Sequence, residues 1–173
     1  MAHNGLGSAL CAKGQCDAAI AEYREAIRLN PDYDHAHNNL GLALDVAGQP
    51  NAAIAEFKEA IRLNPDFAEA LNNLGVVLAD EGQHDAAIAQ LKEVIRLEPD
   101  DARPHDNLGS ALEAEGQHDA AIAEFKEAIR LKPDLAEAHS NLGSALEAEG
   151  QRDAATAEFK KAARLKPHLA RAH

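Results

Sequence analysis

Aromatic residues, methionine and cysteine are all scarce in this chain of 173 residues. It has no tryptophan and one methionine, and aromatic residues make up 3% of the sequence. So low an aromatic content disfavours one large globular core and favours a thin structure of small-residue helix contacts. The two cysteines, Cys11 and Cys16, are too few and too close together for a disulfide framework, which favours a reducing, cytoplasmic compartment.

Long apolar runs and basic stripes are also missing. No apolar stretch approaches the roughly 20 residues that a transmembrane helix needs, and the N-terminus lacks the charged and apolar regions of a signal peptide. The net charge of −12 offers little to neutralise phosphate groups. We therefore expect neither a membrane nor a nucleic acid as partner.

What the sequence does contain is a strict repeat of 34 residues. Glycine recurs at this interval along the whole chain, at Gly7, Gly41, Gly75, Gly109 and Gly143. A leucine before each glycine, a second glycine seven residues after it and a proline that closes each unit keep the same interval. Such a repeat predicts a stack of units, each of which buries its apolar face against its neighbours.

Each unit is predicted to hold two amphipathic helices, near 34–47 and 51–63 in the second unit, with Gly48 as the break between them. We expect the polar residue at the start of each second helix to be its N-cap: Asp17, Asn51, Asp85, Asp119 and Asp153. Glycine inside a helix costs about 1 kcal/mol relative to alanine. We therefore expect Gly41 to allow close approach of the second helix at the small residue Ala53.

This pattern resembles the tetratricopeptide repeat (TPR) family over essentially the whole chain. The segment NNLGLALDVAGQPNAAIAEFKEAIRLNPDF carries the Leu, Gly, Leu, Gly, Ala, Phe, Ala and Pro positions of that motif in order. The resemblance implies an all-α, right-handed superhelical solenoid of five helix-turn-helix repeats in a single array, 1–173. The repeats are expected at 1–33, 34–67, 68–101, 102–135 and 136–169, with 170–173 as the start of a sixth.

The two ends of the array differ from its middle. The first helix begins without the first residue of a unit and carries Gly5 where the next unit has Asn39, so we expect it to fray. At the other end, Thr156 and Ala163 replace isoleucines of earlier repeats, which softens the outer face as capping requires. We expect a monomer, or weak end-to-end self-association.

The resemblance also implies that the first helices line a concave groove. Segments 34–47, 68–81, 102–115 and 136–149 each carry a net charge of −2 or −3. Either these acids only keep the protein soluble, or they attract a basic protein or peptide. The expected charged positions are Asp45, Glu69, Asp80, Glu113, Glu137 and Glu147.

A column of asparagines is the most specific feature of the predicted groove: Asn39, Asn73, Asn107 and Asn141. It is similar to the asparagine ladder of the TPR domain of O-linked N-acetylglucosamine transferase, which implies contacts to the backbone of an extended peptide. A carboxamide both donates and accepts, so it suits an amide unit of any sequence. Alternatively, the asparagines bond across neighbouring repeats. Asn38 and Asn72 are expected beside the ladder.

Nine histidines raise divalent metal binding as the alternative function. His105 and His139 share one column, and His84 and His118 share another, in the turn between helices. No two histidines lie four residues apart on one helix and there is no CxxC, so a tight metal site or any other cofactor is not expected. No nucleophile is paired with a base and no phosphate-binding loop is present, so we expect a non-enzymatic scaffold.

Overall fold

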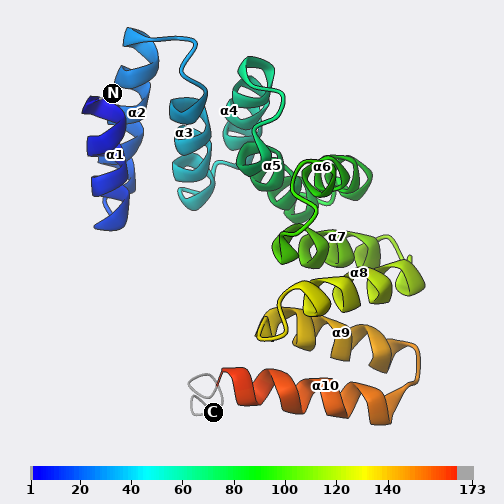
Figure 1. Ribbon diagram of the computed structural model, residues 1–173. Helices are drawn as coiled ribbons and strands as arrows, with labels where there is room; N and C mark the ends of the chain where they lie inside the picture. The colour runs from blue at the N-terminus through cyan, green and yellow to red at the C-terminus, as the bar shows by residue number, and fades with distance from the viewer. Residues whose placement is uncertain (1, 167–173) are drawn as a thin grey trace. The chain divides into compact units, whose positions relative to one another are not determined.

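The structure, a computed structural model, describes residues 2–166, and within that range it contains ten α-helices and no strand. In chain order the helices are α1 (Ala2–Ala12), α2 (Cys16–Leu29), α3 (Asp34–Val46), α4 (Pro50–Leu63), α5 (Ala68–Asp80), α6 (His84–Leu97), α7 (Ala102–Ala114), α8 (His118–Leu131), α9 (Ala136–Ala148) and α10 (Arg152–Leu165) (Figure 1). The predicted all-α class and helix positions are confirmed. The first helix is formed from Ala2 onward in spite of Gly5.

The chain divides into two compact units, Met1–Gln83 with α1 to α5 and His84–His173 with α6 to α10. The boundary falls inside the predicted third repeat, 68–101. Within each unit, the first and second helices of a repeat pack as a pair: α1 with α2, α3 with α4, α7 with α8 and α9 with α10. The expected start of a sixth repeat, 170–173, lies outside the described residues.

The first helices form one face of each unit, which we call the inner face. The first helix of a repeat packs on the second helix of the repeat before it, as α3 does on α2 and α9 on α8. First helices of neighbouring repeats also touch, α1 with α3, α3 with α5 and α7 with α9. Among the described helices of each unit, no two second helices bring Cα atoms within 8 Å of each other. Side chains on the inner face therefore come from several repeats.

In four of the five repeats the glycine of the first helix lies against the aromatic ring of the second helix: Gly7, Gly41, Gly109 and Gly143. The expected contact of Gly41 with Ala53 stays a prediction. A Cβ atom added to Gly41 would lie 2.6 Å from Cε1 of Phe57. The same contact recurs between Gly7 and Tyr23, at 2.6 Å. Ala53 is buried, but the ring of Phe57 is what requires a residue without a side chain. The cost of glycine in a helix is thus offset by close packing of an aromatic ring on the backbone.

The turn after each first helix also depends on glycine. Gly48 has a φ of +71°, in the left-handed region that other residues rarely adopt. The predicted N-caps are wrong by two residues. The helix that follows Gly48 begins at Pro50 and its N-cap is Gln49, so Asn51 is the second residue of the helix. Asp17 and its acidic equivalents lie in the first turn, where a negative charge interacts favourably with the helix dipole.

Replacing Gly41 with alanine should lower the free energy of unfolding by about 1–3 kcal/mol, because the new methyl group overlaps the buried ring of Phe57. Gly5 is the matched control, since it also lies in a first helix but has nothing within 4 Å of an added Cβ. Gly5→Ala should raise stability by about 0.5–1 kcal/mol. Chemical denaturation measures both changes, and equal effects of the two substitutions would contradict the packing role of Gly41.

Candidate functional site

The ladder asparagines join neighbouring repeats to one another on the inner face. Nδ2 of Asn39 donates to Oδ1 of Asn4 at 3.0 Å, and Nδ2 of Asn73 donates to Oδ1 of Asn38, also at 3.0 Å. In the second unit, Nδ2 of Asn141 donates to Oδ1 of Asp106 at 3.0 Å. Each of these side chains thus donates one hydrogen bond to the preceding repeat. The sequence left two roles open, contact with a peptide and bonding between neighbouring repeats, and these bonds are the second.

The two positions beside the ladder, Asn38 and Asn72, differ in burial. Asn38 is 1% exposed, and its Nδ2 donates to Oε1 of Glu69 at 3.2 Å while its Oδ1 accepts from Asn73. It is therefore a buried structural amide. Asn72 and Asn107 are half-buried. Asp106 takes the Asn38 position in the fourth repeat, and burial raises the pKa of its carboxyl more than the hydrogen bond from Asn141 lowers it.

The predicted acidic residues fall into two groups. Glu69 and Glu137 lie four residues before a ladder asparagine, and Asp80 lies seven residues after one, so these three share the inner face and are exposed. Asp45, Glu113 and Glu147 share a different position, six residues after the ladder position. In that position Oε1 of Glu113 lies 2.9 Å from Nδ1 of His118, at the start of α8. Three of the six acids thus belong to the inner face.

The histidine column is tied to carboxylates of the second helices. Nδ1 lies 2.6 Å from the carboxylate of the residue 19 positions later in His3–Glu22, His37–Glu56 and His139–Glu158, and 2.7 Å in His105–Glu124. Nε2 of His37 and of His139 contacts the carbonyl oxygens of Pro31 and Pro133, at 3.0 Å each. Each ring nitrogen of His37 and His139 therefore has a protein oxygen atom as its hydrogen-bond partner, and a metal ion would have to displace one of these partners.

The sequence contains a signal for these pairs that the prediction missed. In the third repeat the histidine is replaced by Leu71, and the residue 19 positions later is Gln90 instead of glutamate. Histidine and glutamate are thus lost together, as expected if each needs the other when it is removed from water. In the fifth repeat, burial by itself would raise the pKa of Glu158. Lys161 and His139 together outweigh burial and hold that pKa below its ordinary value.

The histidines proposed as metal ligands are not gathered around a common point. No group of three His, Cys, Asp or Glu side chains among residues 2–166 is placed to hold a metal ion. His105 and His139 are bound to Glu124 and Glu158. Nδ1 of His84 and Oε2 of Glu113 are buried and have no hydrogen-bond partner in the described part of the chain. Metal binding stays a prediction, which calorimetry with zinc and nickel would test.

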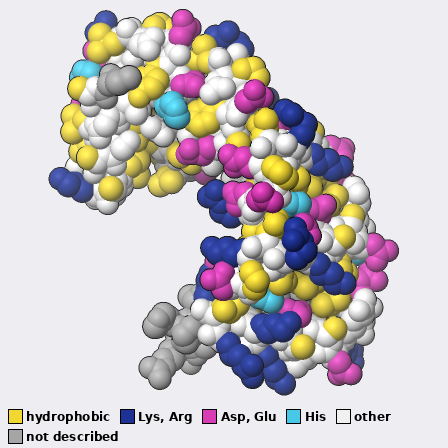
Figure 2. Space-filling view, viewed as in Figure 1, with side chains coloured by type: hydrophobic (Ala, Val, Ile, Leu, Met, Phe, Trp, Pro, Cys, Tyr) yellow, Lys and Arg dark blue, Asp and Glu magenta, His cyan; other side chains and the backbone are white. Residues whose placement is uncertain are grey.

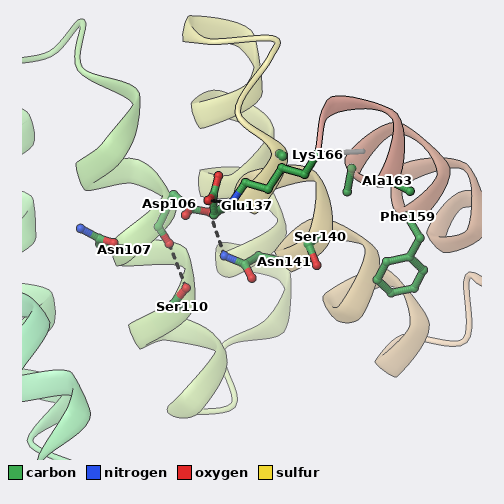
Figure 3. Close-up of a pocket in the computed structure, with 11 residues that line it drawn as sticks. Asp106, Asn107, Ser110, Glu137, Ser140, Asn141, Phe159, Ala163 and Lys166 are labelled. Atoms are coloured by element: carbon green, nitrogen blue, oxygen red, sulfur yellow. Dashed lines mark hydrogen bonds and ion pairs between the residues drawn. The ribbon is translucent and has the colours of Figure 1, made fainter. Parts of the chain in front are cut away.

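An open pocket of about 560 Å³ lies where the inner face of the second unit meets α10 (Figure 3). Asp106, Ser140 and Asn141 form its polar side, and Glu137 and Lys166 form an ion pair at its edge. Phe159 and Ala163 of α10 form the apolar side. Figure 3 shows Asn141 reaching across to Asp106 below this edge. The pocket combines a hydrogen-bonding wall with an apolar wall, as a peptide-binding surface requires.

Helix pairs that repeat every 34 residues are typical of a TPR protein, and family models confirm the class. Models described as TPR repeat and tetratricopeptide repeat match residues 7–44 and 112–150, 45–102 and 136–169. The chain belongs to the tetratricopeptide repeat family. No curated protein matches it. None of the helices formed by residues 2–166 is long and apolar enough to cross a membrane.

Among solved structures, the chain is similar to MamA. One MamA crystal structure is 32% identical with a TM-score of 0.84, over 95% of this chain and 96% of that chain. A second is 30% identical with a TM-score of 0.82, over 99% and 93%. YrrB, described as a TPR protein with an unusual peptide-binding site, is 23% identical with a TM-score of 0.77, over 96% and 86%. At this level of identity, the similarity to YrrB shows a common fold and nothing more.

Substitution of the His37–Glu56 pair should reproduce the natural change at Leu71 and Gln90. His37→Leu should destabilise the protein by about 1–3 kcal/mol, because it leaves the partly buried Glu56 without its hydrogen bond. Glu56→Gln should cost less, because the amide oxygen still accepts from His37 but carries no charge. The double variant should recover part of the loss, with a coupling energy of about 0.5–3 kcal/mol. Chemical denaturation of wild type, the two single variants and the double variant measures this coupling energy. If the effects of the two single substitutions simply added in the double variant, the pairing would be contradicted.

Asp106→Asn should stabilise the protein at neutral pH, because asparagine occupies the same position in the second repeat and still accepts from Asn141. Since the folded state raises the pKa of Asp106, the ionised carboxylate opposes folding above that pKa. The advantage of the variant should therefore shrink as the pH falls and Asp106 becomes protonated. Denaturation curves at neutral and acidic pH measure it. A variant that is less stable at neutral pH would contradict this account.

Proposed function

We propose that this protein is a non-enzymatic scaffold of the cytoplasm that binds a basic peptide segment of another protein on the inner faces of its two units. TPR proteins are interaction modules, and YrrB, with the same fold, is described as having a peptide-binding site. The observation that carries the proposal is the make-up of the inner face. It places rows of half-buried amides beside exposed carboxylates from successive first helices.

The ladder amides keep hydrogen-bonding capacity for a peptide. A carboxamide has two N–H donors and an acceptor oxygen, and the bond to the preceding repeat uses one donor. Because that bond also fixes the orientation of the side chain, the oxygen of Asn39, Asn73 or Asn141 is held in place before a peptide arrives. A pre-organised group loses less conformational entropy on binding.

The acids supply attraction and selectivity rather than shape. Glu69 accepts a hydrogen bond from Asn38, and Glu137 shares the rim of the pocket with Asn141. Lys and Arg side chains of a peptide would meet these carboxylates at the solvent edge. Such contacts speed association and weaken as salt rises. Basic side chains, by contrast, gather over α10, where Arg152, Lys160, Lys161 and Arg164 outnumber Asp153 and Glu158 (Figure 2).

A selection from unstructured peptide libraries tests this function. A library rich in Lys and Arg should yield binders, and a matched library rich in Asp and Glu should not. The double variant Glu69→Gln/Glu137→Gln should weaken a selected peptide by roughly fivefold to tenfold at low salt and much less at high salt. The control Asp17→Asn/Asp119→Asn removes two exposed charges from second helices and should have little effect.

The ladder is tested on the same peptide. Replacing Asn39, Asn73, Asn107 and Asn141 with alanine should weaken binding by at least about tenfold, as expected for lost hydrogen bonds to a peptide backbone. Circular dichroism and thermal unfolding show whether the fold survives the loss of bonds between repeats. Unchanged affinity in a folded variant would limit the ladder to a structural role. Selection of acidic peptides would contradict the proposed partner.

A further inference from the structure

We propose that the inner face of the first unit selects peptides in which a large apolar residue and a Lys or Arg occupy positions i and i+3. The apolar side chain binds at a surface that we call the apolar subsite, formed by Leu42, Val46 and Val76. The basic side chain binds at Asp80. The inference rests on the proposed function, because the ligand is the same peptide. It adds which side chains the first unit recognises and how they are spaced.

Leu42 and Val46 are exposed on α3 although both are large apolar residues. Leu42 is 38% exposed and Val46 is 73% exposed. They lie three and seven residues after Asn39, so all three side chains share one side of the helix. Asn39 bonds to Asn4 of the preceding repeat on the inner face. The pair therefore lies beside the ladder, and apolar side chains that stay in water next to fixed polar groups are typical of a binding surface.

The neighbouring first helix, α5, extends this surface. Val76 is half-buried and takes the position of Leu42 one repeat later, three residues after Asn73. Because α3 contacts α5, residues at equivalent positions of these two helices are neighbours on the inner face. Asp80 likewise takes the position of Val46, and it is exposed. The same position of the repeat is thus apolar on α3 and acidic on α5, within one unit.

In the first helices of the second unit, α7 and α9, small residues replace these apolar side chains. Ser110 and Ser144 take the position of Leu42, and the position of Val46 is an alanine in both helices. Each serine hydroxyl donates to the backbone carbonyl oxygen four residues earlier, at 3.1 and 3.2 Å. These hydroxyls are bonded to their own helix and offer no apolar area. Selectivity for an apolar residue therefore belongs to the first unit.

The distance between neighbouring helices determines the spacing in the peptide. Packed helices lie about 8–10 Å apart, so the side chains at Val46 and Asp80 are separated by roughly that distance. A polyproline II segment has about 3 residues per turn and rises about 3.1 Å per residue, so side chains at i and i+3 point to the same side, roughly 9 Å apart. In a β-strand, side chains at i and i+3 point to opposite sides. A polyproline II peptide therefore places both side chains on the two helices at once.

Charge supports a basic residue beside the apolar one. Glu69 and Asp80 are both exposed on the inner-face side of α5. Neither α3 nor α5 contains a Lys or Arg. A basic side chain of the peptide is attracted to these carboxylates and meets no competing cation from the two helices that form the subsite. The apolar subsite thus has an acidic neighbour on one side, which fixes the order of chemistry that the peptide must match.

Fluorescence anisotropy with labelled synthetic peptides tests the inference. The parent peptide is a segment rich in proline and serine with Leu at i and Arg at i+3. Wild type should bind it about tenfold more tightly than the peptide with Ser in place of Leu. The double variant Leu42→Ser/Val46→Ala, which carries the residue types of the second unit, should lose that preference. Leu29→Ser is the matched control, because Leu29 is 58% exposed on α2, and it should bind like wild type.

A second set of measurements tests the basic position. Moving Arg from i+3 to i+2 should weaken binding to wild type by roughly threefold to fivefold, because the side chain then points away from α5. Asp80→Asn should weaken the parent peptide by a similar factor at low salt, and it should leave a peptide with Gln in place of Arg unaffected. Circular dichroism verifies that each variant is folded.

The outcomes separate this inference from the proposed function. If the double variant keeps the preference for Leu, or if Arg binds equally well at both spacings, the inference is wrong while peptide binding stands. If no peptide with Arg binds wild type, the proposed function fails with it. Sedimentation of wild type and the double variant covers the remaining occupant. Self-association of wild type that the double variant abolishes would identify a second copy of the chain on this surface and would overturn the inference.

Discussion

Everything in this fold depends on how closely the two helices of a repeat approach each other. In the second repeat the ring of Phe57 lies on the backbone of Gly41, at a distance that leaves no room for a Cβ atom. The same contact joins Gly143 to Phe159 in the fifth repeat. Because the ring fixes the spacing of the pair, it also fixes where polar side chains of one helix meet those of the other. The His–Glu pairs and the inner face follow from that spacing.

Burial determines how the polar side chains of the repeats are paired. A charge or amide that is removed from water needs a partner, and here the partner is supplied at a constant sequence separation. Histidine meets glutamate 19 residues later within a repeat, and a ladder asparagine meets the polar residue of the repeat before it. Residues that resemble a metal-binding column are thus committed to neighbouring groups. Glu69, Asp80 and Glu137 stay exposed on the inner face, where the proposed peptide would meet them.

The 34-residue interval determined the class of protein, the positions of the helices and the family, because periodic glycines, prolines and apolar residues constrain the backbone locally. The sequence could not decide which side chains meet across that backbone. The position of Gly41 suggested a close approach of the second helix, but only packing showed that the ring of Phe57 is the group nearest to it. The column of His139 suggested metal binding as an alternative function, and only the approach of α9 to α10 showed that the histidine meets Glu158. The spacing of residues along a chain sets the faces of its helices, whereas the partner of each side chain is decided by the close packing of one helix on the next.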